Sequence, residues 1–295
     1  MERETSKQIE ALNKKLVKLE DALSDISSRL FNQPKLLFAD ETRILIEAET
    51  FFWEFPKAQI NHALSYLNPG FDQGLRAFLY ANIKADSTFI DIGANAGILT
   101  CIGAKLVGAN GQAISVEPIT DLAATIRRNV FMNAPLTPYE HHIAAAGGHE
   151  RSQVFQVFKN DSRVSTLHFE HSSAATDEYN EIEVHVLDIR SIIPKTPTNV
   201  FLKIDAEGNE EEIMSAVLEH WKNESWHNTH IVFEFGRQHF DRAEVSLDNF
   251  VKRLLDLGLS INLINPYSGM RENPLTADIS NIVDGNYVIS SEAPS

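Results

Sequence analysis

The chain has 295 residues, 43% of them hydrophobic, and its 41 acidic and 26 basic residues give it a formal charge of −15. This length provides for one α/β core with an additional segment. The negative charge, without a basic stripe among aromatic residues, argues against nucleic acid as a partner. No apolar run is long enough to span a membrane, the first residues lack a signal-peptide pattern, and the single cysteine, Cys101, excludes a disulfide framework or cysteine zinc cluster. We therefore expect a cytoplasmic protein.

Residues 1–33 predict a coiled-coil helix that makes the protein oligomeric. From Ile9 to Leu30, apolar residues recur at alternating steps of three and four, which is the a/d pattern of a heptad repeat. A lone helix of this length would be marginal in water and would expose its apolar stripe. We expect homo-oligomers through residues 9–30. Packing of this helix on its own globular domain is the alternative, and the number of strands stays open.

Residues 34–86 predict a mostly helical lead-in that covers one edge of the main sheet. Pro34 ends the first helix, and the following segment is rich in aromatic residues, with "FFWEF" at 51–55. The stretch "GFDQGLRAFLYANIK" at 70–84 has the spacing of an amphipathic helix.

Residues 87–295 predict the main domain, in which strands alternate with helices. Strands are expected at 87–92, 112–117, 139–145, 200–205, 230–235, 260–264 and 286–290. Helices are expected at 97–107, 121–132, 209–221 and 246–257. This alternation predicts a largely parallel sheet with helices on both faces. Two further β-like stretches near 150–190 flank a polar segment and predict an inserted hairpin with a long loop, which in a compact domain is often functional.

The stretch "TFIDIGANAG" at 88–97 predicts a nucleoside-binding turn between a strand and a helix. Gly93 and Gly97, with Asn95 between them, let a ligand approach the backbone. The spacing G-x-x-x-G differs from the G-x-G-x-x-G of pyrophosphate-binding sites. Asp91 would repel a phosphate but would suit a positively charged, unphosphorylated nucleoside, so we expect S-adenosylmethionine. The simpler interpretation is that Asp91 caps the turn.

The second and third strands supply the remaining cofactor-binding candidates. "ISVEP" ends the second strand, and Glu117 there can accept the two hydroxyls of a ribose, as acidic residues also do in NAD sites. Pro118 follows it. Ala144 and Ala145 end the third strand, where small side chains and backbone groups would flank an adenine. A solvated strand end is the alternative for Glu117.

These motifs resemble those of the FkbM family of S-adenosylmethionine-dependent methyltransferases. The resemblance is carried by "FIDIGANAGILT" at 89–100, "ISVEP", "LDI" at 187–189 and "FLKIDAEGNEEEIM" at 201–214. It covers roughly residues 85–290 and implies a Rossmann-like, seven-stranded class I methyltransferase sheet with an antiparallel final strand. It also implies O-methylation of a hydroxyl on a sugar, a glycan or a hydroxylated natural product.

The fourth and fifth strands carry the catalytic candidates. Lys203 and Asp205 fall on one side of the fourth strand, and Asp205 stands at its carboxyl end. Asp205 is the first candidate for the base that removes the acceptor's proton, and it also borders the cofactor. Glu234 interrupts the apolar fifth strand, and His239 follows it, so both are further candidates for the base. Lys203 would orient the acceptor, or else it is a buried lysine paired with acidic neighbours.

Several neighbouring polar residues have competing interpretations. Clustered carboxylates at Asp205, Glu207 and Glu234 could hold Mg²⁺, but no spacing demands a metal and none is predicted. Residues Glu210 to Glu212 are interpreted as a solvated helix start. The polar residues of the inserted loop are candidates for contacting the acceptor; these are Ser162, Arg163, Ser165, Thr166 and His168.

Two other functions are compatible with the sequence. A nicotinamide-dependent oxidoreductase would use Glu117 for the ribose of its cofactor. A catalytically inactive Rossmann scaffold, oligomerised by its coiled coil, is the other alternative. The sequence does not identify the acceptor molecule.

Overall fold

The computed structural model describes residues 34–57, 67–68, 70–158, 165–167, 179–194, 199–223, 229–256, 260–275 and 282–290. The chain divides into two compact units, Met1–Ile60 and Asn61–Ser295. The coiled coil predicted at 1–33, with its oligomer-forming residues 9–30, lies outside the described residues and stays a prediction. Within the described ranges, no helix is long and apolar enough to cross a membrane.

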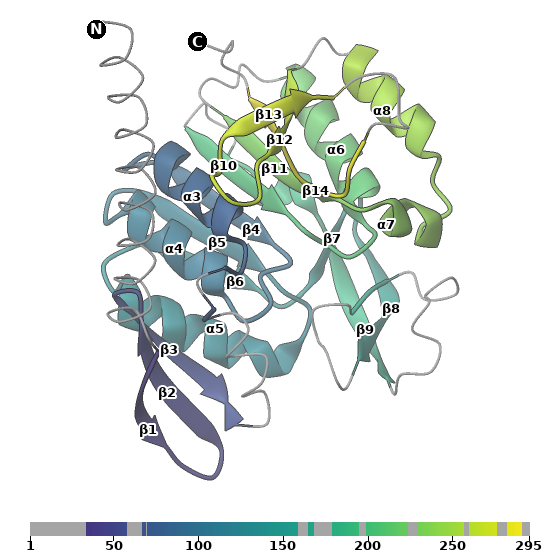
Figure 1. Cartoon of the computed structure of the whole chain (residues 1–295). Helices are drawn as coiled ribbons and strands as arrows, with labels where there is room; N and C mark the ends of the chain where they lie inside the picture. The colour runs from purple at the N-terminus through teal and green to yellow at the C-terminus, as the bar shows by residue number, and fades with distance from the viewer. Residues whose placement is uncertain are drawn as a thin grey trace, which may run out of the picture. The chain divides into compact units, whose positions relative to one another are not determined.

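The first unit contains an antiparallel sheet instead of the predicted helical lead-in. Its strands follow in the order β1 (Lys35–Ala39), β2 (Arg43–Ala48) and β3 (Phe51–Pro56) (Figure 1). The prediction of a mostly helical segment is therefore wrong for this stretch. Glu49 and Thr50 both have positive φ, 53° and 70°, as a two-residue hairpin turn requires.

The alternation of buried and more exposed residues along β2 explains why this segment forms a sheet and not a helix. Ile44, Ile46 and Ala48 are buried, while the residues between them are more exposed, which is a period of two and not of 3.6. Phe51 and Trp53 lie on the same side of β3 and stack with ring centroids 5.0 Å apart. Aromatic and β-branched residues favour this half-buried, pleated arrangement over a helix.

In the second unit, the described residues form an eight-stranded sheet in the order β13-β12-β14-β11-β10-β4-β5-β6 (Figure 1). The strands are β4 (Thr88–Ile92), β5 (Gln112–Val116), β6 (Tyr139–His142), β10 (Val200–Ile204), β11 (His230–Phe235), β12 (Ile261–Ile264), β13 (Arg271–Pro274) and β14 (Gly285–Ser290). Strand β14 is antiparallel to β11 and β12, and β13 is antiparallel to β12. The chain runs from β4 outward to β6 and then returns to β10 on the other side of β4, so the strand order reverses between β4 and β10.

The seven predicted strands of this sheet are present, with two differences. The predicted third strand, 139–145, divides into β6 and a short β7 (Ala145–Gly147), and β7 pairs with the inserted hairpin. Strand β13 was not predicted, and it adds an edge strand to the seven expected ones. Its sequence, "RENP", has none of the apolar alternation that indicates a strand.

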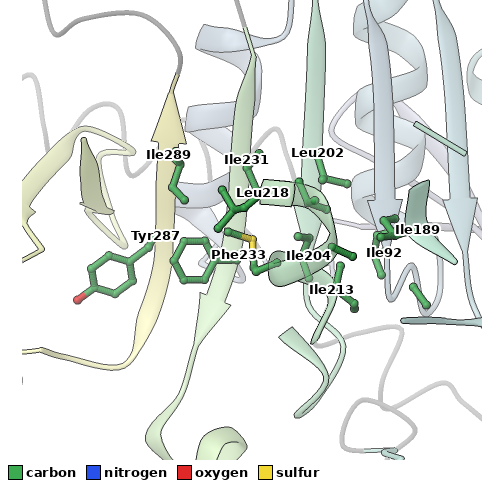
Figure 2. Close-up of a cluster of buried hydrophobic side chains, with 14 of the residues drawn as sticks. Ile92, Ile189, Leu202, Ile204, Ile213, Leu218, Ile231, Phe233, Tyr287 and Ile289 are labelled. Atoms are coloured by element: carbon green, nitrogen blue, oxygen red, sulfur yellow. The ribbon is translucent and has the colours of Figure 1, made fainter. Parts of the chain in front are cut away.

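The helices agree closely with the predicted ranges. They are α3 (Gln73–Asn82), α4 (Ile98–Val107), α5 (Thr120–Asn133), α6 (Glu210–Asn223), α7 (Arg237–Arg242) and α8 (Leu247–Asp256). Among the α-helices of the described residues, the short α7 alone was not expected. On one face of the sheet, α4 approaches β4 so closely that a Cβ at Gly103 would lie 2.1 Å from the Phe89 ring. On the other face, α6, α7 and α8 contribute to the main apolar core, part of which Figure 2 shows.

The inserted hairpin is present as predicted, in a separate three-stranded sheet of order β7-β9-β8. Its long strands are β8 (Arg151–Phe158) and β9 (Tyr179–Asp188), which pair antiparallel. Within the segment between them, residues 165–167 are described, and Thr166 forms a β-bridge with Gln156.

Candidate active site

A cavity of about 380 Å³ opens at the carboxyl ends of β4, β5, β10 and β11. This is where ligands bind in open α/β sheets, next to the point at which the strand order reverses. Of the nine candidate cofactor-binding residues, eight line it; these are Asp91, Gly93, Asn95, Glu117, Pro118, Ala144, Ala145 and Asp205. The ninth, Gly97, does not line the cavity but ends the lining turn, directly before α4. Of the catalytic candidates, Lys203, Asp205 and Glu234 line the cavity. His239 does not line it, but its Nε2 lies 3.4 Å from Glu207, which does.

The turn after β4 has the left-handed backbone conformation that favours glycine. Gly93 and Gly97 have φ of 73° and 80°, and Asn95 between them has φ of 46°. A Cβ at Gly93 would lie 1.8 Å from the carbonyl oxygen of Asp205. Glycine is therefore required at position 93 both for the conformation and for the close approach of β4 to the end of β10.

Gly93→Ala is expected to destabilise the protein more than Gly108→Ala does. Gly108 has the same φ of 73°, but a Cβ there would meet nothing within 4 Å. Gly108→Ala should cost only backbone strain, about 1–3 kcal/mol, and the clash at Gly93 should add about 1–3 kcal/mol. Urea denaturation of the two variants measures the difference. Equal losses of stability would mean that the β4 turn can move away from β10 without cost.

Asp91 is fully buried and balanced by groups of the protein itself. Its Oδ2 accepts a hydrogen bond of 2.6 Å from the Thr100 hydroxyl, and its Oδ1 lies 3.2 Å from the Lys203 Nζ. The capping interpretation thus describes only part of its environment. Asp91 shapes the cavity wall and holds Lys203, and its charge is not free for a ligand alone.

Lys203 connects the ends of β4 and β10. Its ammonium group donates to the carbonyls of Ile92 and Gly93, at 3.3 and 3.0 Å, and lies 3.4 Å from the Asp205 carboxylate. Burial disfavours its charge, but Asp91 and Asp205 more than offset this and raise the pKa of Lys203 above its ordinary value. This geometry is that of the alternative interpretation, a buried lysine paired with acidic neighbours.

Glu117 is a buried carboxylate at the end of β5, only 4% exposed, and not a solvated strand end. Its two oxygens accept hydrogen bonds from the backbone N–H groups of Asn95, at 2.8 Å, and Ile119, at 2.9 Å. Burial raises the pKa of Glu117 to about 7, although these bonds and the charge of Lys203 oppose the shift. Each oxygen has a second lone pair, so the carboxylate has the capacity to accept two hydroxyls of a bound diol.

The side of the cavity next to Glu117 is apolar. Ala144 and Ala145 line it beside Pro118, as the sequence indicated. Phe155 of β8 and Leu167 of the inserted segment also line the cavity. These two residues were not predicted, because their approach to the cavity depends on how the hairpin folds back.

Acidic residues at the ends of β10 and β11 also line the cavity; these are Asp205, Glu207 and Glu234. The charge of Asp205, followed by burial and a hydrogen bond between the two side chains, raises the pKa of Glu234 to about 9. Burial also raises the pKa of Glu207, which lies 3.4 Å from the Nε2 of His239. Burial opposes protonation of His239, but the neighbouring carboxylates of Glu207 and Glu210 raise its pKa to about 11. Both shifts favour the protonated forms of Glu234 and His239.

Glu210 has a role that the sequence did not suggest. Instead of lying on a solvated helix start, it is 1% exposed and accepts hydrogen bonds from the backbone N–H groups of Ala206, at 2.7 Å, and Gly208, at 2.9 Å. It thereby holds the turn in which Glu207 has a positive φ of 49°. An acidic residue that follows a glycine turn at a helix start is the signal that could have revealed this capping interaction.

The described part of the inserted loop also supports this turn. Thr166 is 1% exposed, and its hydroxyl donates to the Glu207 carbonyl at 2.6 Å. The Ser165 hydroxyl accepts from the backbone N–H of Phe158 at 3.3 Å. Thr166 therefore positions the turn instead of meeting an acceptor. Ser162, Arg163 and His168 lie outside the described residues.

The strand order, with its reversal between β4 and β10 and its antiparallel β14, and the cavity at the strand ends define the class I methyltransferase fold. The chain belongs to the family of the Vibrio cholerae RfbT protein, whose family model matches residues 6–290. A comparison with curated proteins finds no match to this chain.

Solved structures similar to this chain include three methyltransferases. The O-methyltransferase TomG from Streptomyces achromogenes is 10% identical, with a TM-score of 0.42 and coverage of 91% of this chain and 95% of that one. A SAM-dependent O-methyltransferase from Thermotoga maritima is 10% identical, with a TM-score of 0.40 and coverage of 85% and 78%. A SAM-dependent methyltransferase from Aquifex aeolicus is 13% identical, with a TM-score of 0.39 and coverage of 79% and 95%. These scores are low, and the fold is assigned from the strand order itself.

Proposed function

We propose that this protein is an FkbM-related O-methyltransferase that uses S-adenosylmethionine to methylate a hydroxyl of a sugar, a glycan or a hydroxylated natural product. The observation that carries the proposal is the charge of the cavity. Among the described residues that line it, Lys203 is basic and six others carry a carboxylate; these are Asp72, Asp91, Glu117, Asp205, Glu207 and Glu234. S-adenosylmethionine has a sulfonium and an ammonium group and no phosphate, so this cavity favours it over a dinucleotide with its pyrophosphate.

The residues present fit this cofactor. Glu117 would accept the ribose hydroxyls, because its carboxylate is buried, has no direct cationic partner among its hydrogen bonds in the described structure, and keeps free lone pairs. The small residues Ala144 and Ala145 would border the adenine, and the turn from Gly93 would let the nucleoside approach the backbone. When bound, the cofactor supplies an electrophilic methyl group.

The chain's own residues would then serve the acceptor. Asp205 borders the cavity with a side chain that is 36% exposed, so an incoming hydroxyl can reach it and give up its proton. Such a base contributes typically about 10²–10⁴-fold to a rate. Phe155 and Leu167 would exclude water from the apolar side. The turn that carries Asp205 is kept in place by Glu210 and Thr166, which favours a fixed orientation of the base.

Titration calorimetry separates this proposal from a nicotinamide-dependent oxidoreductase. S-adenosylhomocysteine is expected to bind, and NAD⁺ is not, because its two phosphate charges would meet the carboxylates of the cavity. Binding of NAD⁺ without binding of S-adenosylhomocysteine would refute the methyltransferase assignment.

The acceptor can be sought by radiolabelled methyl transfer. The RfbT family is linked to modification of the O-antigen, so hydroxyls of surface polysaccharides are the first acceptors to test. Sugar nucleotides, glycolipids and cell extracts complete the screen. Label transferred to protein alone would place the acceptor outside the proposed class.

A further inference from the structure

The acidic side of the cavity brings together a carboxylate–histidine cluster, formed by Glu207, Glu234 and His239. These residues come from three segments, the turn after β10, the strand β11 and the helix α7. Each offers one ligand atom, and the three atoms all lie within 4.8 Å of one another. Two oxygen or nitrogen ligands on opposite sides of one divalent ion are about 4–5 Å apart, so a single ion can reach all three.

His239 has the surroundings of a metal ligand, which distinguishes this cluster from a group of acidic residues. Its Nε2 lies toward Glu207, and its Nδ1 lies 3.7 Å from an oxygen of Glu210. Nδ1 is buried and makes no hydrogen bond within the described structure. A carboxylate behind the second ring nitrogen is the arrangement that orients metal-bound histidines. Glu210 is itself fixed by its bonds to two backbone N–H groups.

The cluster lies directly beside Asp205. A hydrogen bond joins the side chains of Glu234 and Asp205, and the Asp205 carboxylate in turn lies 3.4 Å from the Lys203 ammonium. A divalent ion bound by the cluster would therefore lie next to Asp205.

We propose that Glu207, Glu234 and His239 bind a divalent cation of the Mn²⁺ class beside Asp205. Two carboxylates and one imidazole favour Mn²⁺ over Mg²⁺, which prefers oxygen ligands alone. If the proposed function holds, the ion lies next to the base and polarises the acceptor hydroxyl, which makes that proton easier to remove. This role rests on the proposed function, whereas binding of the ion does not.

Binding is tested by titrating metal-free protein with Mn²⁺ and following the signal of free Mn²⁺ by electron paramagnetic resonance. The wild-type protein should bind one Mn²⁺ ion, and this ion should stay bound when Ca²⁺ is added in excess. Glu234→Gln and His239→Gln should each weaken binding by at least about tenfold. Glu219→Gln, which removes an exposed carboxylate of α6, is the matched control and should bind as the wild type does.

A second measurement needs no variant. In the wild-type protein, bound Mn²⁺ should broaden the amide resonances of residues 205–210 and 234–239 and leave those of 100–107 in α4 sharp. The proposal would be overturned if the wild-type protein bound no Mn²⁺, or if all variants bound Mn²⁺ equally well. It would also be overturned if the broadening of amide resonances spread over the whole acidic surface. S-adenosylhomocysteine is titrated in parallel. If S-adenosylhomocysteine binds and Mn²⁺ does not, the metal site is refuted and the proposed function stands. If Mn²⁺ binds and S-adenosylhomocysteine does not, the proposed function is refuted and the metal site stands.

Discussion

Asp205→Asn is expected to lower the rate of methyl transfer by about 10²–10⁴-fold, the contribution of a positioned base. Asparagine keeps the shape of the side chain but cannot accept a proton. Glu234 and His239 cannot replace it, because the charge of Asp205 raises the pKa of the first and carboxylate partners raise that of the second. Single-turnover assays with labelled S-adenosylmethionine measure the loss directly.

The same variant should still bind the cofactor. The contacts expected to hold the nucleoside come from Glu117 and the Gly93 turn, and the Lys203 ammonium keeps its pairing with Asp91 when Asp205 is neutral. Asp121→Asn, on the exposed first turn of α5, is the matched control and should keep full turnover. Turnover near the wild-type level in Asp205→Asn would transfer the role of base to another group. Loss of cofactor binding together with turnover would show that Asp205 acts mainly on the cofactor.

Glu117→Ala is expected to weaken binding of S-adenosylhomocysteine by about 1.5–3 kcal/mol, the scale of a lost hydrogen bond to a charged group. This corresponds to roughly a 10- to 150-fold higher Kd. Since the Glu117 carboxylate also accepts from the N–H groups of Asn95 and Ile119, Glu117→Gln is the milder comparison and should retain part of this support. An unchanged Kd in both variants would remove Glu117 from the site.

The pH dependence gives a sharper readout for Glu117. Burial raises its pKa from an ordinary value of 4.5 to about 7 in the free protein. Hydroxyls donate best to the ionised form, so cofactor affinity should fall as the pH drops below 7, and Glu117→Gln should remove this dependence.

The stability of the ligand-free protein should depend on pH in the opposite direction. The folded-state pKa of Glu117 is raised, so its contribution to stability is complete below pH 4.5 and is lost as the pH rises toward 7. Thermal denaturation of ligand-free wild-type and Glu117→Gln protein between pH 4.5 and 7.5 checks this sign.

The main sheet and the cofactor side of the cavity could be predicted from sequence because both depend on local patterns. Apolar runs of five or six residues indicate buried strands, and they alternate with segments that have the spacing of amphipathic helices. The folded structure keeps both kinds of element. The glycines at positions 93 and 97 indicated a ligand-binding turn, and Glu117 followed the next strand. Parallel strands align their carboxyl ends, so these three positions meet in any sheet of this order.

The β1–β3 sheet shows where local patterns were insufficient. "FFWEF" fits a helix or a strand by composition, and its conformation was decided by pairing with β2, whose alternation is visible only once the partner is known. Strand β13 likewise owes its conformation to the edge of β12 and not to its own residues.

The sequence by itself determined the order of strands and helices, the glycine turn and which carboxylates end the strands, because each follows from a short-range period or a backbone conformation. Only the tertiary structure decided what those charged groups do. Lys203 became a link between β4 and β10, Glu210 a buried support for its own turn, and His239 the neighbour of Glu207. The physical reason is that burial and the distances between charges, which set ionisation and pairing, arise from segments far apart in the chain.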